Sequence, residues 1–453
     1  MLERDSLKAL DEALSVLEQG FSAMPDFKPA PLNPKGREVL LETARRMQDN
    51  YPYPHPLYAG QMLKPPHAMA RLAYMLALWI NPNNHALDGG RASSPLEREA
   101  VAAIAAMFGY QEHLGHLSAS GTIANLEALW VARHAKPGLV LASSQAHYTH
   151  SRMCEVLGMP FKAVPVDSRG RMDLDALEDL LKREQVATVV VTLGNTALGA
   201  VDPLHEVIKL RAKYGFRIHV DAAYGGYFKL VDNLGKDARA AYDATHEADS
   251  IVVDPHKHGL QPYGCGCVLF KDPSVGRYYK HDSPYTYFTS AELHLGEISL
   301  ECSRAGAAAV ALWATQRLLP MVPGGEFAKG LAAGCDAALS LHAALKQDSR
   351  YLPGIDPELD IVVWSLAGSG RKQAGERAQA VFDAAAQRHL HLALLKVPDA
   401  LAKAWWPKLA ADADMTVALR SVLMKPEHRE WLPKIREILD ASTSQVLAHT
   451  VSG

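Results

Sequence analysis

The sequence predicts an α/β protein: a large domain with a mainly parallel sheet covered by helices, followed by a smaller C-terminal α+β domain. Short β-branched apolar runs alternate with amphipathic helical stretches from about residue 67, and such alternation implies crossover connections between parallel strands. The chain has 453 residues, 48% of them hydrophobic, which suits one large domain with smaller units. Polar residues follow several apolar runs directly, at the strand ends where open sheets bind ligands. We expect an N-terminal helix and arm over 1–66, the large domain over 67–319 and the small domain over 320–453.

The elements can be justified in chain order. Residues 1–20 have helical spacing, whereas residues 22–66 are rich in proline and aromatic residues and predict an extended, turn-filled arm. Helices are predicted for 95–109, ended by Gly109, and for 121–136. The predicted strands are 138–144, 161–167, 186–194, 216–223, 250–257 and 265–270. The helices between and after them are 150–158, 173–185 (with Asp173 as a cap), 202–215 and a long helix that begins in 304–319.

Composition excludes several classes of protein. The chain carries 47 Lys+Arg against 50 Asp+Glu, so it lacks the basic surface of a nucleic-acid binder. Its longest apolar runs, such as 73–80, are too short to cross a bilayer, and the charged N-terminal stretch does not resemble a signal peptide. Five scattered cysteines argue against a disulfide framework and for a reducing compartment. We therefore expect a cytoplasmic protein with no membrane or nucleic-acid partner.

Three strand ends carry groups that fit one ligand. The segment HLSASGTIAN (116–125) places Gly121 and Thr122 at a helix start, where backbone N–H groups and the helix dipole favour a phosphate. Asp221 follows an apolar strand and can pair with a buried cation. Lys257 ends the run SIVVDPHK, and a lysine amine can condense with an aldehyde. Taken singly, these are a helix cap, a turn aspartate and a surface lysine, but phosphate, cation and aldehyde together describe pyridoxal 5′-phosphate.

Five motifs carry a resemblance to a known family. They are SGTIANLEAL (120–129), SSQAHYTHSR (143–152), TLGNTALGAVDP (192–203), HVDAAYGG (219–226) and DPHK (254–257). From about residue 51 to 310, with a weaker match near 417–424, the chain resembles the group II pyridoxal-phosphate-dependent amino-acid decarboxylases of fold type I. That family includes glutamate, aromatic and tyrosine decarboxylases, with sphingosine-phosphate lyase more distant. The resemblance implies a sheet of the seven-stranded type, an amino-acid substrate and a homodimer whose active sites lie at the interface.

The resemblance also implies roles for individual residues. His147 would stack on the cofactor ring, Asp221 would bind the pyridine nitrogen, and Lys257 would be the covalent anchor. The implied cofactor contacts are Gly121, Thr122, His147, Thr196, Asp221, Ala223, His256 and Lys257. The chain departs from the family pattern at Asn195, where threonine is frequent, at Ile123, where glutamate is common, and at His258–Gly259, where an aromatic pair is frequent.

The implied reaction is α-decarboxylation of an L-amino acid to CO₂ and an amine, and echoes of tyrosine decarboxylases around Lys257 and Tyr285 favour aromatic substrates. Tyr285 or Tyr287 would protonate Cα, unless these tyrosines only line the pocket. The implied substrate-binding residues are His55, Ser94 and Arg420, of which the first two can also be plain turn residues. The roles of Arg304 and His258 stay open, with a packed or surface histidine favoured for His258.

The alternatives are a metal site, another reaction with the same cofactor and a protein without catalysis. Cys265 and Cys267 form a Cys-x-Cys that would suit zinc, but both fall on one face of an apolar strand, so we expect buried packing and no metal. His113 and His116 are expected to be surface or cap histidines. The same cofactor could instead serve a carbon–carbon lyase, an aldehyde-forming decarboxylase or an aminotransferase. A protein of a different class, which binds the cofactor without catalysis, is a further alternative. Product identity would distinguish these.

Overall fold

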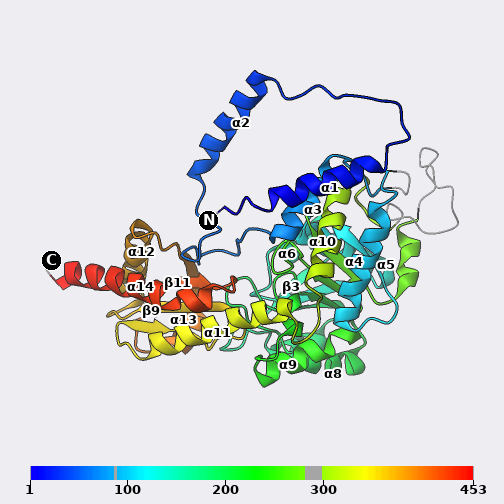
Figure 1. The fold of residues 1–453 in the computed structure, drawn as a ribbon. Coiled ribbons are helices and arrows are strands. Elements are labelled where there is room, and N and C mark those ends of the chain that lie inside the picture. The colour runs from blue at the N-terminus through cyan, green and yellow to red at the C-terminus, as the bar shows by residue number, and fades with distance from the viewer. Residues whose placement is uncertain (1, 86–88, 281–297, 452–453) are drawn as a thin grey trace.

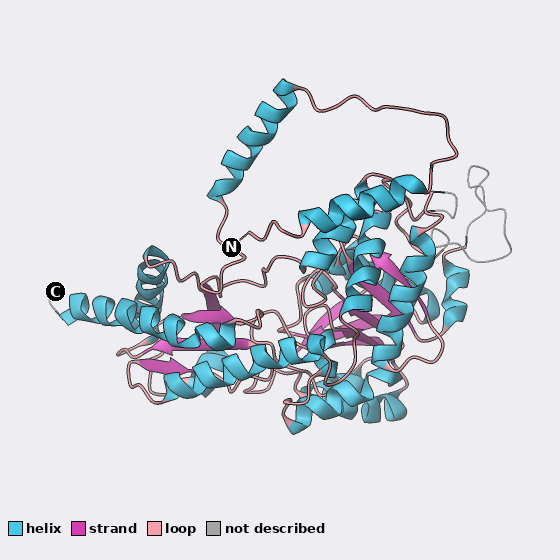
Figure 2. Ribbon diagram, viewed as in Figure 1, coloured by secondary structure: helices cyan, strands magenta, loops and turns pink. Residues whose placement is uncertain are grey.

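Two sheets organise the molecule (Figures 1 and 2). The computed structural model describes residues 2–85, 89–280 and 298–451. A seven-stranded sheet lies in the larger part of the chain, and a four-stranded sheet belongs to the C-terminal part. The predicted α/β class, with a large mainly parallel sheet and a smaller α+β unit, is confirmed.

The large sheet has the strand order β1-β7-β6-β5-β4-β2-β3. Its strands are β1 Leu114–Ser118, β2 Leu139–Ser143, β3 Phe161–Val164, β4 Val186–Thr192, β5 Arg217–Asp221, β6 Ser250–Val253 and β7 Gly266–Phe270. From β6 to β3 all neighbours pair in parallel, whereas β7 is antiparallel to both β6 and β1. Every strand except β7 therefore runs the same way, and their carboxyl ends meet at one edge.

Helices connect and cover these strands. They are α3 Ala68–Leu78, α4 Ser93–Phe108, α5 Gly121–Ala135, α6 Thr149–Val156, α7 Leu174–Arg183, α8 Leu204–Tyr214, α9 Lys236–Asp243 and α10 Gly306–Leu318. Short 3₁₀ turns lie at η1 Met47–Asp49, η2 Gly226–Leu230, η3 Ala244–Glu247 and η4 Pro273–Tyr278. The predicted end of α4 and the predicted cap of α7 are confirmed. Gly109 ends α4 at φ 88°, a conformation that glycine adopts without strain. The Asp173 carboxylate accepts a hydrogen bond from the N–H of Ala176 at the start of α7. Among the described residues, none of the helices has both the length and the apolar character needed to cross a membrane.

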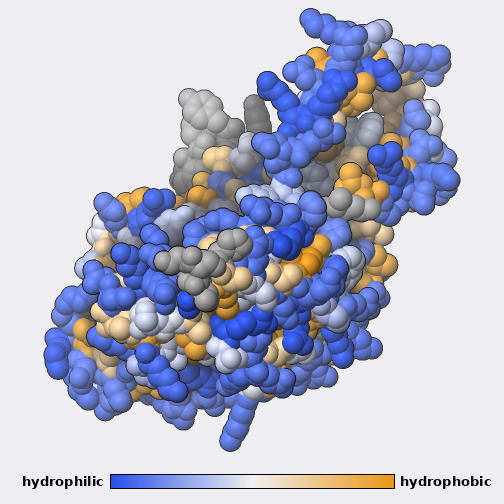
Figure 3. All heavy atoms as spheres, turned by 90° about the vertical axis from the view of Figure 1, so that its left-hand side faces the viewer, coloured by the Kyte–Doolittle hydropathy of each residue, from blue (hydrophilic) through white to orange (hydrophobic). Residues whose placement is uncertain are grey.

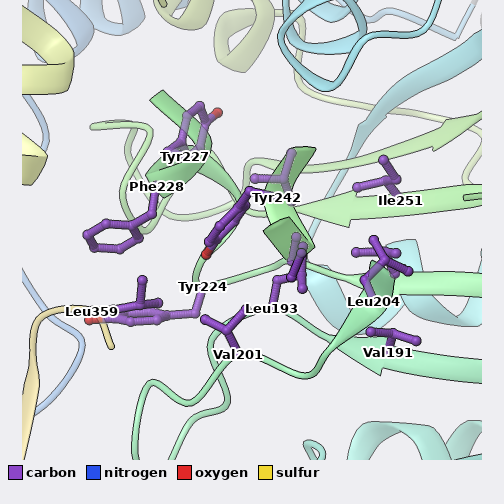
Figure 4. Packing of buried hydrophobic residues seen from close by; sticks show 14 of the residues in the cluster. Val191, Leu193, Val201, Leu204, Tyr224, Tyr227, Phe228, Tyr242, Ile251 and Leu359 are labelled. Atoms are coloured by element: carbon purple, nitrogen blue, oxygen red, sulfur yellow. The ribbon is translucent and has the colours of Figure 1, made fainter. Parts of the chain in front are cut away.

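The C-terminal unit is built on the antiparallel order β10-β11-β9-β8. Its strands are β8 Tyr351–Pro353, β9 Ile361–Leu366, β10 Ala393–Pro398 and β11 Met415–Val422, and its helices are α11 Glu326–Lys346, α12 Arg371–Gln387, α13 Asp399–Trp405 and α14 His428–Val451. Trp364 on β9 is fully buried in its core. The segment before β9 also packs on the large sheet: Leu359 lies beside Tyr224 in the main core (Figure 4), and the Tyr224 hydroxyl donates to Asp360 at 2.6 Å. The two units are thereby joined next to the strand ends.

The expectation of an extended arm over 22–66 is wrong in one respect. After α1 (Leu7–Gln19), which the sequence predicted, the arm contains a second helix, α2 (Pro34–Arg46). Asn33 caps it by accepting from Gly36 N–H at 2.8 Å, and Pro34 occupies its first position, where proline is tolerated. Prolines on both sides of α2 are typical of extended or turn segments, so the sequence did not predict this short helix.

Helix α2 has no buried residue. It stands apart from both sheets at the top of Figure 1, and in Figure 3 hydrophobic groups are visible among the hydrophilic ones in the corresponding upper part. Val39, Leu40 and Leu41 are all exposed, with Leu40 at 62%. Consecutive helical residues point in different directions, and the described part of the chain covers none of these three side chains.

The prediction that His116 is a surface or cap residue is also wrong. Residues 114–118 form strand β1, which the sequence did not reveal, and His116 is fully buried. Its Nε2 lies 2.9 Å from a carboxylate oxygen of Glu127 on α5. A buried histidine needs such a partner, and this one is supplied by the next helix. Cys265 and Cys267 are buried free thiols, in agreement with the packing interpretation.

Arg304 lies in a buried ion pair beside the start of α10. Its guanidinium donates to Glu97 on α4 at 2.6 Å and to the Leu117 carbonyl at 2.6 Å. The other Glu97 oxygen accepts from Asn84 at 2.6 Å, so the carboxylate is fully engaged. Arg304 therefore fixes α4 and the end of β1 to each other, and it does not line the strand-end pocket described below.

Replacing Arg304 by Met is expected to destabilise the fold by about 3–5 kcal/mol, because the Glu97 carboxylate would remain buried without its cation. The free energy of unfolding in denaturant would measure this loss. The double variant Arg304→Met with Glu97→Gln should recover part of it, since the unpaired charge is gone. An unchanged denaturation midpoint for Arg304→Met would show that the pair contributes nothing.

Candidate active site

A pocket of about 180 Å³ lies where the strand ends converge. All eight residues predicted to contact the cofactor line it. They are Gly121 and Thr122 at the start of α5, His147 after β2, Thr196 after β4, Asp221 and Ala223 at the end of β5, and His256 and Lys257 after β6. Residues 136 positions apart in sequence thus share one cavity, because parallel strands end at the same edge of the sheet.

Lys257 forms an ion pair that the sequence analysis missed. Its Nζ lies 3.0 Å from a carboxylate oxygen of Asp254, and the lysine side chain is 23% exposed toward the pocket. Burial acts to lower the pKa of Lys257, but the charge and hydrogen bond of Asp254 outweigh it, so the pKa is raised. The spacing of three residues in DPHK was the available signal, since it returns the side chains of Asp254 and Lys257 to the same side of a turn.

Asp221 is held by His150, a second residue that was missed. His150 Nε2 lies 2.8 Å from one carboxylate oxygen, and the N–H of Ala223 donates to the other at 3.1 Å. Burial acts to raise the pKa of Asp221, but the hydrogen bond and charge of His150 and the charge of Lys257 outweigh it and hold the pKa below its usual value. Asp221 is therefore ionised and buried, ready to pair with a cation.

A neutral histidine on β5, His219, connects this strand to helix α5. Burial lowers the pKa of His219 to about 3, so its ring carries no charge at neutral pH. Its Nε2 donates to Asn125 Oδ1 at 2.8 Å, and the Asn125 amide donates to the Gly121 carbonyl at 2.8 Å. Gly121 itself approaches Asp254 so closely that an added Cβ would lie 2.5 Å from the carboxylate. The position of the α5 N-terminus is thus fixed from two sides.

His147 has one nitrogen engaged by its own turn. Its Nδ1 accepts from the N–H of Thr149 and lies 2.7 Å from the Thr149 hydroxyl. Burial lowers the pKa of His147, which favours the neutral ring, and the accepting Nδ1 leaves the proton on Nε2. His147 can therefore offer a flat, uncharged ring with one free N–H to the pocket.

Arg420 reaches the edge of the pocket from β11 of the C-terminal sheet. Its guanidinium donates to the Thr196 carbonyl at 2.9 Å and to Gln61 at 2.7 Å. The side chain is buried, so a cation lies beside the cavity without lining it. The departure at Asn195 has a structural role, because its amide bridges Leu198 N–H and the Gly170 carbonyl and shapes the turn that presents Thr196.

Other predicted residues are not brought into the pocket. His55 packs edge-on against Trp431, and Ser94 is buried at the start of α4; neither lines the cavity. Tyr285 and Tyr287 lie outside the described residues. His258 is buried, with its Nε2 3.2 Å from Asp360, which agrees with packing. In the described part of the chain no three His, Cys, Asp or Glu side chains are grouped so that they could hold a metal ion.

The donor set of the pocket fits pyridoxal phosphate. The start of α5 presents backbone N–H groups for a phosphate, Asp221 offers an anion for a pyridinium, and Lys257 offers a primary amine. Within the described structure, His256 Nδ1 and Thr192 Oγ1 are buried without a hydrogen-bond partner, and both residues line the pocket. Unpaired buried polar atoms are costly, so a ligand that satisfies them would be stabilised here.

Comparison with protein families agrees with this geometry. Residues 54–367 match the pyridoxal-dependent decarboxylase conserved domain, which covers well over half of the chain. The chain belongs to this family. The predicted membership, the cofactor pyridoxal phosphate and the enzyme class are thereby confirmed: the protein is a pyridoxal-phosphate-dependent amino-acid decarboxylase.

Its relatives are named for different amino acids. An L-tyrosine decarboxylase of Enterococcus faecium is 28% identical over 412 residues, covering 68% of this chain and 67% of the relative. An aspartate 1-decarboxylase of Aliivibrio fischeri is 30% identical over 355 residues, covering 67% of this chain and 63% of the relative. This decarboxylase thus spans about two thirds of the length of these relatives.

Solved structures share its fold over nearly the whole chain. Oryza sativa TDC, solved with PLP and tryptamine, has a TM-score of 0.78 at 17% identity and covers 98% of this chain and 99% of its own. Mouse CSAD in its apo form has a TM-score of 0.76 at 18% identity, with 96% and 98% covered. At such identities the likeness concerns the fold alone.

Proposed function

We propose that this decarboxylase acts on aromatic L-amino acids, with L-tyrosine as the first candidate, and releases CO₂ and the aromatic amine. The convergence of Lys257, Asp221 and His147 in one strand-end pocket carries the proposal for the reaction. The naming of relatives as tyrosine decarboxylases supports the aromatic side chain. The Tyr263 ring, 5.0 Å from that of His256, adds an aromatic neighbour to the pocket.

In this proposal the eight predicted contact residues would hold the cofactor. The N-terminus of α5 at Gly121 and Thr122, together with His256, binds the phosphate. Asp221 pairs with the protonated ring nitrogen, Lys257 is the covalent anchor, and Ala223, Thr196 and His147 contact the ring. When bound, pyridoxal phosphate supplies an electron sink for the pair released at the substrate Cα.

The remaining steps belong to side chains of this chain. His147 is neutral, with its proton on Nε2. Its ring would lie flat against the cofactor ring, and it can pass a proton. Arg420, which lies beside the pocket, attracts the substrate carboxylate through its charge, and reaching it directly requires Arg420 to leave its bonds to Thr196 and Gln61. His55 and Ser94 are also proposed for the substrate side, although they do not line the cavity of the single chain. Tyr285 is proposed to deliver a proton to Cα once CO₂ has left.

The test is a substrate panel. The purified protein, loaded with pyridoxal phosphate, is incubated with each common L-amino acid separately, and products are identified by mass spectrometry. An aromatic amine that lacks the elements of CO₂ would support the proposal, and β-alanine or another acidic-substrate amine would move the specificity to the aspartate-type relatives. An aldehyde, a keto acid or a cleaved carbon chain would overturn decarboxylation to an amine.

We further propose that the protein works as a homodimer in a reducing, cytoplasmic setting. Its five cysteines are free, and Cys302 is exposed. The apolar row Val39, Leu40 and Leu41 on α2 requires a cover that this chain does not provide within its described residues. A second copy, receiving the arm over its own surface, would supply that cover.

Replacing Leu40 and Leu41 by Asp is expected to convert the dimer to a monomer at micromolar concentration. Charges would then replace apolar side chains that the second copy is proposed to cover. Light scattering coupled to size-exclusion chromatography measures the mass. Glu42→Gln, on the same helix, is the matched control and should leave the dimer intact. A dimer that survives the double substitution, or a monomeric unsubstituted protein, would contradict this role of the arm.

A further inference from the structure

A second cavity, of about 660 Å³, borders the residues that directly follow Lys257. It is formed by residues 64–67, by His258 and Leu260, by the first turns of α11 and by the connection from β11 to α14. It shares no lining residue with the strand-end pocket. Its volume lies in the range of sites that hold small organic ligands.

Two lysines line this cavity without a carboxylate partner. Lys425 is only 4% exposed and donates to the Tyr58 carbonyl at 2.6 Å, and Lys64, half-buried, donates to the Met424 carbonyl at 3.2 Å. Within the described residues, no salt bridge joins either amine to an acidic group. Each ammonium has three N–H donors, so one carbonyl leaves donors unused on both.

Both amines are less readily charged than an exposed lysine. Burial, together with the charge of Lys64, lowers the pKa of Lys425 to about 7, although the charge of Glu427 acts in the opposite direction. Burial lowers the pKa of Lys64 to about 8, although Asp360 and Glu427 act in the opposite direction. The charged form of a lysine is costly to bury, and an anion bound beside both amines would lower that cost.

The rest of the lining combines apolar residues with charged ones, among them the carboxylates of Glu326, Glu427 and Glu430. Leu260, Phe327 and Met424 contribute hydrocarbon surface. Lys329 and Arg429 line the cavity beside the carboxylates of α11 and α14. A ligand that matches these features has an anionic group for the lysines and an apolar body for the wall.

We propose that this cavity binds a small organic anion, whose carboxylate or phosphate group lies between Lys64 and Lys425 and whose apolar body packs against Phe327 and Met424. The site is separate from the substrate pocket and does not depend on which amino acid is decarboxylated. Because His258 lines the cavity and directly follows Lys257, a ligand there contacts the segment that carries the active-site lysine.

The experiment is calorimetric titration of the cofactor-loaded protein with four probes. Phenyl phosphate and phenylacetate carry the two head groups on one apolar body, inorganic phosphate lacks the body, and benzyl alcohol lacks the charge. At least one aromatic anion is expected to bind at least about tenfold more tightly than both inorganic phosphate and benzyl alcohol. The tighter of the two anions identifies the head group.

Variants assign the binding to this cavity. Lys425→Met and Lys64→Met are each expected to weaken binding of that anion at least about tenfold, whereas Lys408→Met, an exposed lysine outside the cavity, leaves it unchanged. Lys425→Arg, which keeps the charge, should retain binding if the methionine variant fails to fold. Arg420→Met should also bind normally, since that arginine serves the other pocket.

The proposal is overturned if no aromatic anion binds, if both lysine variants bind as the unsubstituted protein does, or if only Arg420→Met abolishes binding. Decarboxylation is assayed on the same samples. Anion binding without release of CO₂ would count against the proposed reaction and leave this site standing.

Discussion

Lys257→Ala is expected to lower the decarboxylation rate by about 10³-fold or more, the largest effect of any single substitution in the pocket. Lys257 is the one primary amine among the residues that line the pocket, and its Nζ is positioned by Asp254 at 3.0 Å. Without it, the residues that line the pocket would offer the aldehyde of the cofactor no primary amine. The rate is measured as CO₂ release under saturating cofactor.

A second readout separates loss of the anchor from loss of the fold. Borohydride treatment should add the mass of the reduced cofactor to the unsubstituted chain and not to Lys257→Ala. Lys271→Ala, a lysine just beyond β7 and outside the pocket, is the matched control and should retain both activity and labelling. Full activity or undiminished labelling in Lys257→Ala would move the anchor to another lysine.

Asp221→Asn is expected to lower the rate by about 10²–10³-fold while the cofactor still binds. The amide keeps the shape of the carboxylate but removes the negative charge that would hold a proton on the ring nitrogen. A protonated ring withdraws electrons from Cα, and a neutral ring does so weakly. The absorbance spectrum of the loaded protein and the rate of CO₂ release measure the two effects, and an unchanged rate would contradict the role of Asp221.

His150→Phe provides a graded version of the same experiment. The hydrogen bond from His150 at 2.8 Å helps to keep the pKa of Asp221 low, whereas burial acts to raise it. Removing His150 therefore raises the pKa of Asp221, so the carboxylate becomes protonated at a higher pH and activity is lost earlier on the acidic side. We expect a rate lowered by about tenfold near neutral pH, as suits the loss of one charge-assisted hydrogen bond. An acidic limb that does not move would show that His150 only packs.

Strand-end position predicted part of the pocket from the residues alone. Gly121, Asp221 and Lys257 each follow an apolar run within a few residues, and a parallel sheet brings such positions to one edge. His147, Thr196, Ala223 and His256 were implied by the family resemblance. The same reasoning failed for α2, where prolines on both sides masked a short helix capped by Asn33. It also failed for His116, since nothing near that histidine announces the carboxylate of Glu127.

The sequence by itself determined the α/β class and, at the strand ends, Gly121, Thr122, Asp221 and Lys257, because periodicity and strand-end position are local properties. Only the tertiary structure decided which side chains tune and support them. His150 meets Asp221 across 71 residues, Arg304 meets Glu97 across 207, and Lys425 reaches the Tyr58 carbonyl across 367. Such pairs form when separate elements pack and bury polar groups that must then be satisfied, and no pattern along the chain records which partner each will meet.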